Sequence, residues 1–276
     1  MNFAKTYAKN VLERFANTST TRGVLSDEYK FNADSGKSIT VLSMSTATMH
    51  DYSRTGTNRY GTPEDLETSA QELLCTKERS FAFVIDGLNN LDAGGIMEAG
   101  KALRRQLDEV ITPEIDAYTV GVLAAKAVEN GNKVATAPTK DNAYSLFLDC
   151  QIMLDKAKAP RQNRVAWVSS EYYKYIKLDP SFIKSSEIAN EAVLNGQVGV
   201  IDGVPVILAN YGDLPTNTHL VLAHKSAAVQ PFRLEQFVTH INPPGINGAL
   251  CEGLVVYDAI VLDQRKKAIA VIDTTG

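Results

Sequence analysis

The sequence lacks most of the patterns that mark a catalytic or metal-binding protein. Its three cysteines, Cys75, Cys150 and Cys251, lie far apart and form no Cys-x-x-Cys pair, so we expect buried thiols rather than metal ligands. Its four histidines have no histidine partner four residues away and no cysteine close by in sequence. The motifs Gly-x-Ser-x-Gly, His-Glu-x-x-His and Gly-x-Gly-x-x-Gly are all absent. We therefore predict no catalytic residues, no metal site and no enzyme activity.

A complete phosphate-binding loop is missing as well. Gly36, Lys37 and Ser38 match the end of such a loop. That pattern also requires a glycine five positions before Gly36, where this chain has Phe31. We therefore predict that the chain binds no cofactor.

The chain also lacks an excess of positive charge and any long apolar run. Its formal net charge is -4, which argues against a protein whose main task is to grip nucleic acid electrostatically. No apolar run approaches the roughly 18 residues that a membrane-spanning helix needs, so we expect no membrane partner. Hydrophobic residues at 44% and charged residues at 22% are ordinary for a globular protein. At 276 residues the chain can bury a real core, as one large domain or two small ones.

What the sequence does contain is a long amphipathic helix between Gly95 and Asn130. Apolar residues recur there every three or four positions, and charged residues, among them Glu114 and Asp116, fill the opposite side. Pro113 interrupts the run because proline removes a helical hydrogen bond. We expect either a kink near 109–112 or two helices that meet there.

A long polar loop is the second clear feature. Strands are predicted over Lys37–Met44 and Glu72–Ile85, and the segment Ser45–Ser69 between them has few aliphatic residues. Loops longer than about 15 residues are uncommon in compact domains and are usually functional or mobile. We expect this loop to project from the subunit and to contact a partner surface.

The large side chains of this loop are the candidate contact residues. Tyrosine and arginine are the residues that most often anchor protein interfaces. The candidates are Asp51, Tyr52, Arg54, Arg59 and Tyr60. The alternative is a solvated loop whose charges make no contact.

The remaining segments form a regular series. Residues 2–16 predict a short amphipathic helix, and the polar stretch after it predicts an extended arm that is either disordered or lies on another surface. Asp202-Gly203 suits the type I′ turn of a hairpin between Val198–Ile201 and Val204–Leu208. Further elements are a helix over Asn142–Ala157, a buried strand over Arg164–Val168, and apolar strands over Leu254–Leu262 and Ala268–Ile272.

Taken in order, these segments resemble the major capsid proteins of tailed bacteriophages, which have the Hong Kong-type capsid fold. The resemblance lies in the order and spacing of several stretches over most of the chain. These are HDYSRT followed by TKERSFAFVID, then EIDAYTVGVLAAKA, then NRVAWVSSEYYKYI followed by NGQVGVIDGVPVILANYGDLP, then LVLAHKSAAVQP and FRLEQFVTH, and finally YDAIVLDQRKKAIAVI.

The resemblance implies an α+β fold with four parts. Residues 1–36 would be an N-terminal arm and residues 37–84 an extended β-hairpin loop. Residues 85–140 and 236–276 would form a peripheral domain with a long spine helix, and residues 141–235 an axial domain.

It also implies a structural role. Such proteins assemble as homo-oligomers, in pentamers and hexamers, into an icosahedral shell that encloses double-stranded DNA and contacts it weakly. The expected location is the virion, with assembly in the host bacterial cytoplasm. A portal protein is an expected partner. No long helical segment precedes the arm, so we expect a separate scaffolding protein, or none, rather than a fused scaffolding segment.

Two alternatives remain open from the sequence. Bacterial encapsulin shells share this fold, and the predicted helix at 2–16 could serve cargo there. A small-molecule enzyme of α/β type is the other class, for which the sequence supplies no signature.

Overall fold

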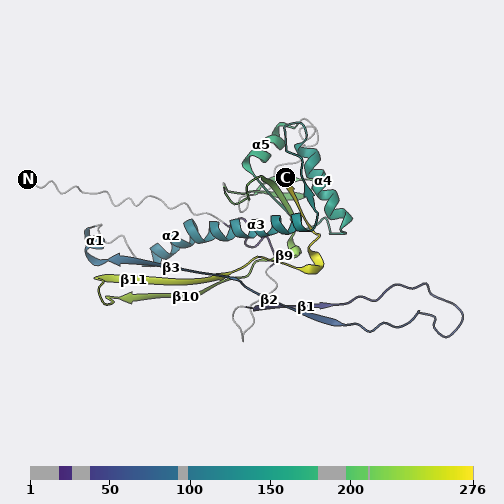
Figure 1. Cartoon of the computed structure of the whole chain (residues 1–276), viewed down its shortest axis with the longest axis horizontal. Helices are drawn as coiled ribbons and strands as arrows, with labels where there is room; N and C mark the ends of the chain where they lie inside the picture. Colours follow the sequence, from purple (N-terminus) through teal and green to yellow (C-terminus); the bar gives the residue numbers. More distant parts are fainter. Residues whose placement is uncertain (1–18, 27–37, 93–98, 180–196, 211, 276) are drawn as a thin grey trace, which may run out of the picture. The chain divides into compact units, whose positions relative to one another are not determined.

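The computed structural model describes residues 19–26, 38–92, 99–179, 197–210 and 212–275 (Figure 1). The chain divides into a smaller compact unit, Tyr29–Cys75, and a larger one that contains Met1–Glu28 and Thr76–Gly276. The helix predicted at 2–16 lies outside the described residues. So does the part of the predicted spine helix before Ala99.

The smaller unit is a two-stranded hairpin with a long connection. Strand β1 (Ser38–Met44) pairs antiparallel with β2 (Thr68–Leu74), and the polar loop joins them, as predicted. Ile39 and Val41 are buried. Because side chains alternate along a strand, the neighbouring positions face the other way, and Leu42, Met44 and Leu74 are exposed there.

The single strand predicted over Glu72–Ile85 is wrong. The structure has two strands, β2 and β3 (Lys77–Asp86), and they belong to different units. They separate at Thr76, whose backbone N and Oγ1 donate to Oδ2 of Asp258 at 2.7 and 3.0 Å instead of joining a ladder. The predicted extended loop at 37–84 therefore includes most of a strand of the larger unit.

A three-stranded antiparallel sheet forms one part of the larger unit, in the order β10 (Phe232–Ile241), β11 (Gly248–Tyr257), β3. The short helix α1 (Gly87–Asp92) follows β3. One face of the sheet packs against the helical run that comes next in the chain. Ile111 and Ile115 of that run cluster with Val255 and Tyr257 of β11.

The spine is one continuous helical path with a π-helical turn in it (Figure 1). Helix α2 (Ala99–Gln106) passes through the π turn Leu107–Ile111 into α3 (Thr112–Glu129). Thr112 N donates to Leu107 O, one residue further back than in an α-helix. Pro113 follows in the first turn of α3. The alternative of two helices that meet at 109–112 is wrong, because the backbone stays helical through Ile111 and Thr112. The kink stays a prediction.

A six-stranded mixed sheet forms the other part of the larger unit. Its order is β4 (Lys133–Val134), β13 (Ile269–Asp273), β8 (Thr218–His224), β5 (Arg164–Val168), β7 (Val204–Leu208) and β6 (Gln197–Ile201). The Asp-Gly hairpin is confirmed, because Ile201 pairs with Val204 and both Asp202 and Gly203 have positive φ. The remaining short elements are β9 (Ala228–Val229), β12 (Ile260–Val261) and two 3-10 turns, Lys225–Ala227 and Asp263–Arg265.

Both faces of this sheet are covered. Helices α4 (Ala143–Lys156) and α5 (Ser170–Leu178) bury one face around Phe147 and Tyr172. Helix α3 covers the other face around Trp167. Burial on both faces explains why these strands read as nearly continuous apolar runs.

The sheets do not follow the predicted domain boundaries. Strands β4 and β13, which the sequence grouped with the spine, pair within the sheet of the 141–235 segment. Strand β10 begins at Phe232, before the predicted boundary at 236. The two strands predicted over Leu254–Leu262 and Ala268–Ile272 also lie in different sheets.

Candidate assembly surface

The long loop of the smaller unit is bonded across its two arms. Ser45 N donates to Glu67 O at 2.9 Å, and Glu67 N donates to Ser45 Oγ at 2.9 Å. These bonds continue the hairpin beyond its last ladder pair, Met44 with Thr68. The loop is therefore an extension of the hairpin at its base.

A second bridge forms further along the loop. Glu64 Oε2 accepts Thr48 N at 3.0 Å and Thr48 Oγ1 at 3.3 Å, and these bonds hold the pKa of Glu64 below its usual value. His50 Nε2 lies 3.9 Å from Glu64 Oε1. A side chain at position 61 would clash with the His50 ring. The φ of Gly61 is 81°, a conformation that residues other than glycine rarely adopt.

The tip of the loop brings together three of the five predicted contact residues. The rings of Tyr52 and Tyr60 meet edge to face with centroids 5.2 Å apart. Arg59 O accepts Ser53 N at 3.0 Å, and Arg59 Nε donates to Gly56 O at 3.2 Å. These bonds place Arg59 between the two arms of the tip.

The other two predicted residues, Asp51 and Arg54, are simply exposed. Tyr60 remains 85% exposed despite its ring contact, so the tip presents an aromatic and cationic surface to solvent. Sequence reasoning missed the apolar part of this surface. Met49 is 94% exposed, and Leu66 is exposed on the opposite arm of the loop. The sequence did offer a sign of this apolar surface, because Met49 and Leu66 are apolar residues within an otherwise polar loop.

Asp258 holds Thr76, the residue that follows the hairpin unit in the chain. Besides Thr76, its carboxylate accepts Tyr118 Oη at 2.9 Å and the backbone N of Ala259 at 2.7 Å. The Lys77 ammonium lies 5.1 Å from the centroid of the Tyr118 ring. Asp258 thus links Thr76, the spine helix and the end of β11.

Part of the N-terminal segment is anchored on the spine through Asp116. The Asp116 carboxylate accepts Ser19 Oγ at 2.7 Å, Thr20 N at 2.8 Å, and Thr21 Oγ1 at 2.5 Å. Trp167 Nε1 donates to Thr20 O at 3.0 Å. The sequence placed Asp116 on the charged outer side of the helix, and this is wrong, because the residue is buried. Residues 19–26 therefore lie on the spine of their own chain.

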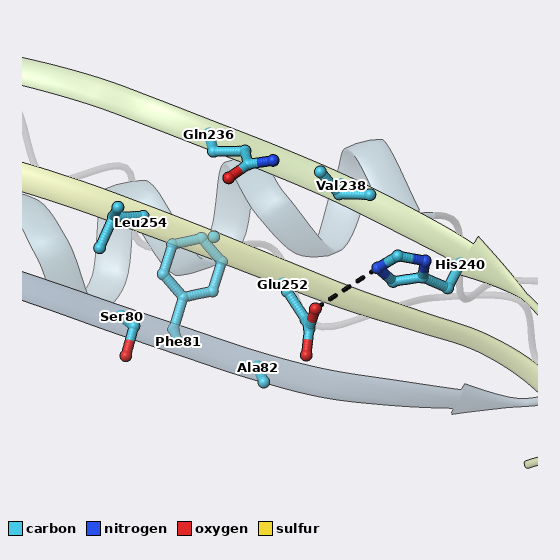
Figure 2. A pocket seen from close by; sticks show the side chains of 9 residues that line it. Ser80, Phe81, Ala82, Gln236, Val238, His240, Glu252 and Leu254 are labelled. Carbon is cyan, nitrogen blue, oxygen red and sulfur yellow. Dashed lines mark ion pairs between the residues drawn. The ribbon is translucent and has the colours of Figure 1, made fainter. Parts of the chain in front are cut away.

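A shallow hollow lies on the face of the three-stranded sheet away from the spine (Figure 2). It has a volume of about 400 Å³, and its polar lining includes Ser80, Gln236, His240 and Glu252. His240 Nε2 lies 3.4 Å from Glu252 Oε2. The rest of its lining is mainly apolar and includes Ala82, Val238 and Leu254.

Two further properties bear on function. Within the described ranges, no three histidine, cysteine, aspartate or glutamate side chains are grouped so that they could hold a metal ion. Among the helices that the structure describes, none is long and apolar enough to span a membrane.

The fold was compared with solved structures. The chain is similar to the capsid structure of the cyanophage P-SCSP1u, with a TM-score of 0.70, 13% identity, and coverage of 98% of this chain and 92% of that chain. A structure from Mycobacterium phage Che8 matches with a TM-score of 0.64 and 18% identity, over 100% of this chain and 98% of that chain. The chain has the fold of a phage capsid protein.

The capsid fold also has a more distant match. A virus-like particle from Pyrococcus furiosus is similar with a TM-score of 0.50 and 12% identity, over 86% of both chains. A scan against protein-family models finds no match, and a search of curated proteins finds none either.

Proposed function

We propose that this chain is the major capsid protein of a tailed bacteriophage. It would assemble with itself, as pentamers and hexamers, into an icosahedral shell that encloses double-stranded DNA. The observation that carries this proposal is the match of nearly the whole chain, 98%, to nearly the whole of a capsid chain, 92%.

In this proposal the hairpin loop of the smaller unit contacts a neighbouring copy. Tyr52, Arg59 and Tyr60 form the centre of the contact, and Asp51 and Arg54 form ion pairs at its rim. The support is physical. A hairpin of two strands is marginally stable alone, and the exposed side chains of Met49 and Tyr60 would bury large apolar areas on docking.

The remaining parts follow the same scheme. The six-stranded sheet with α4 and α5 would form the axial domain, and the three-stranded sheet with the spine would form the peripheral domain. A portal protein and a separate scaffolding protein are the proposed partners, and the packaged DNA is contacted weakly. The protein would reside in the virion after assembly in the host bacterial cytoplasm.

Expression of the chain alone, followed by electron microscopy and sedimentation, tests the proposal. We expect closed shells or capsomers that depend on salt and protein concentration. A monodisperse 30.0 kDa species under every condition would contradict it.

An encapsulin-type shell is the second candidate function. The match to a virus-like particle covers less of the chain and has a lower TM-score than the phage matches, so this alternative is not favoured. Particles purified from the native source would contain DNA under the first proposal and a packaged enzyme under the second. A small-molecule enzyme is the least supported class, since the hollow in Figure 2 offers no nucleophile next to a base.

A further inference from the structure

The turn between β12 and β13 carries three consecutive exposed cations, Arg265, Lys266 and Lys267. Two more exposed lysines, Lys126 and Lys225, come from the elements on either side of the turn. We call these five residues the basic patch. The whole chain has a net charge of -4, so this local concentration of positive charge is opposite in sign to the charge of the chain.

Hydrogen bonds hold the patch together from both sides. On the side of α3, Asn130 Nδ2 donates to Lys266 O at 3.3 Å, and Asn132 Nδ2 donates to Lys267 O at 2.9 Å. On the side of the 3-10 turn that follows β8, Arg265 Nη1 donates to Ser226 O at 3.2 Å. The backbone of the turn is therefore fixed, and the charged groups are presented by an ordered surface.

Among the residues that the structure describes, one of these five cations has an ion-pair partner. Lys126 Nζ pairs with Glu129 Oε2 at 2.6 Å. Among the described residues, Lys225, Lys266 and Lys267 form no ion pair. Glu129 at the end of α3 and Asp263 in the turn are described acidic residues beside these cations.

A simpler explanation accounts for part of the patch. The C-terminus of α3 carries a partial negative charge that favours nearby cations, and this effect falls off within the last helical turn. Lys126 lies in that last turn. Lys225 begins the 3-10 turn after β8, so the end of α3 does not explain its presence.

We propose that the basic patch binds the phosphate backbone of double-stranded DNA. Lysine and arginine side chains neutralise phosphates and release counterions, and this supplies most of the affinity of sequence-independent binding. A membrane surface would be the other common polyanion. Anionic lipid headgroups attract clustered lysine and arginine by charge as well, so binding to vesicles is measured beside binding to DNA. The inference rests on the proposed function, because an enclosed DNA genome is its natural partner.

The test uses the full chain and two variants with the same change in charge. The patch variant is K225Q/K266Q/K267Q, which leaves the Arg265 bond to Ser226 intact. The control variant is K140Q/K156Q/K174Q, at exposed lysines outside the patch. Binding of a fluorescent DNA duplex of about 20 base pairs is measured by anisotropy between roughly 50 and 200 mM salt. Binding to vesicles that contain an anionic lipid is measured in parallel, and shells are imaged by electron microscopy.

We expect the patch variant to bind DNA at least tenfold more weakly at the lowest salt. Its plot of log affinity against log salt should be shallower by about 3, since each phosphate contact contributes about 0.9. The control variant should bind like the parent, and both variants should form the parent's shells. Equal losses in the two variants, no DNA binding by the parent, or binding to vesicles but not to DNA would each overturn the inference. Absence of shells from the parent would instead count against the proposed function.

Discussion

The ring of Phe81 lies directly over Gly253, its cross-strand partner in the three-stranded sheet. A Cβ at position 253 would come within 2.2 Å of Phe81 Cζ. Phe237 is the partner of Gly253 on the other side, and the centroids of the two phenylalanine rings are 6.4 Å apart. Aromatic rings that cover a glycine in a sheet restore the packing that the missing side chain would provide.

This relationship predicts that Gly253→Ala destabilises the protein. The new methyl group must displace the Phe81 ring, and overpacking of this kind costs about 1–3 kcal/mol. Urea unfolding would show the loss as a lower midpoint. Gly100→Ala is the control, because Gly100 lies in α2 with open space around it, and the change should stabilise the helix by about 0.5–1 kcal/mol. A neutral G253A variant would mean that the rings can move apart freely.

Arg164→Lys should cost about 2–4 kcal/mol of folding free energy, because a lysine cannot reproduce the bonds of this fully buried guanidinium. Arg164 Nη2 donates to Asp155 Oδ1 at 2.6 Å and to Ala159 O at 2.7 Å, and Nε donates to Pro160 O at 2.9 Å. Arg161→Lys is a matched control. It pairs with the same Asp155, but its side chain is 79% exposed, so the change should stay within about 0.5 kcal/mol. Chemical denaturation of both variants gives the comparison, and equal losses would contradict the prediction.

Removal of the Asp116 carboxylate should release residues 19–26 from the spine. Asp116→Ala leaves Thr20 N and the Ser19 and Thr21 hydroxyls without their acceptor, at a cost of about 1–3 kcal/mol for each buried donor that stays unpaired. We expect faster proteolysis near Arg22 and a lower melting temperature. Asp149→Ala, at an exposed site on α4, should change neither. Unchanged cleavage near Arg22 in the D116A variant would show that Trp167 and Leu25 suffice as anchors.

Asp213 predicts a specific pH dependence. Burial raises the pKa of this carboxyl from 3.8 to about 6, and the nearby Asp116 charge adds to the shift, although hydrogen bonds from Asn210 oppose it. A carboxyl whose pKa is raised in the folded state contributes stability that is fully present below its unfolded pKa. That contribution is lost as the pH rises through its folded pKa. Asp213→Asn should therefore stabilise the protein at pH 7–8 relative to the parent, and the difference should vanish near pH 4. Thermal unfolding across this range is the measurement, and a pH-independent difference would rule out the titration of Asp213 as the cause.

The loop tip predicts a separation of folding from assembly. Arg54→Ala with Arg59→Ala should change subunit stability by less than ~0.5 kcal/mol, because both side chains lie outside the core. At an interface each truncation could cost more than ~1 kcal/mol, repeated at every copy of the contact. Thermal unfolding of subunits and electron microscopy should show normal folding with lost or aberrant shells. Normal shells of unchanged stability would mean that the loop is not part of the contact.

Local patterns predicted the elements that are made locally. The Asp202-Gly203 turn and the period of the spine helix depend on neighbours a few residues away, so the sequence shows them directly. Asp116 and Thr76 were misread for the opposite reason. Their partners lie about 96 and 182 residues away, and charge or polarity in the sequence does not reveal such a partner. The same limit explains why β13 was not assigned to the sheet of β8.

The candidate surface was predicted in part for similar reasons. Tyr52, Arg59 and Tyr60 were identified from residue type alone, and the structure places them together at the tip. Met49 was not identified from residue type, because methionine is usually buried and only the structure shows that this one is exposed.

The bonds of Asp258 have a mechanical consequence. A pull along β2 would reach the larger unit through the peptide bond between Cys75 and Thr76. There Thr76 is tied through one carboxylate to Tyr118 of the spine and to the end of β11. The load would divide between a helix and a sheet before it reached either core. These bonds at Thr76 would oppose the separation of β3 from β11 one residue pair after another.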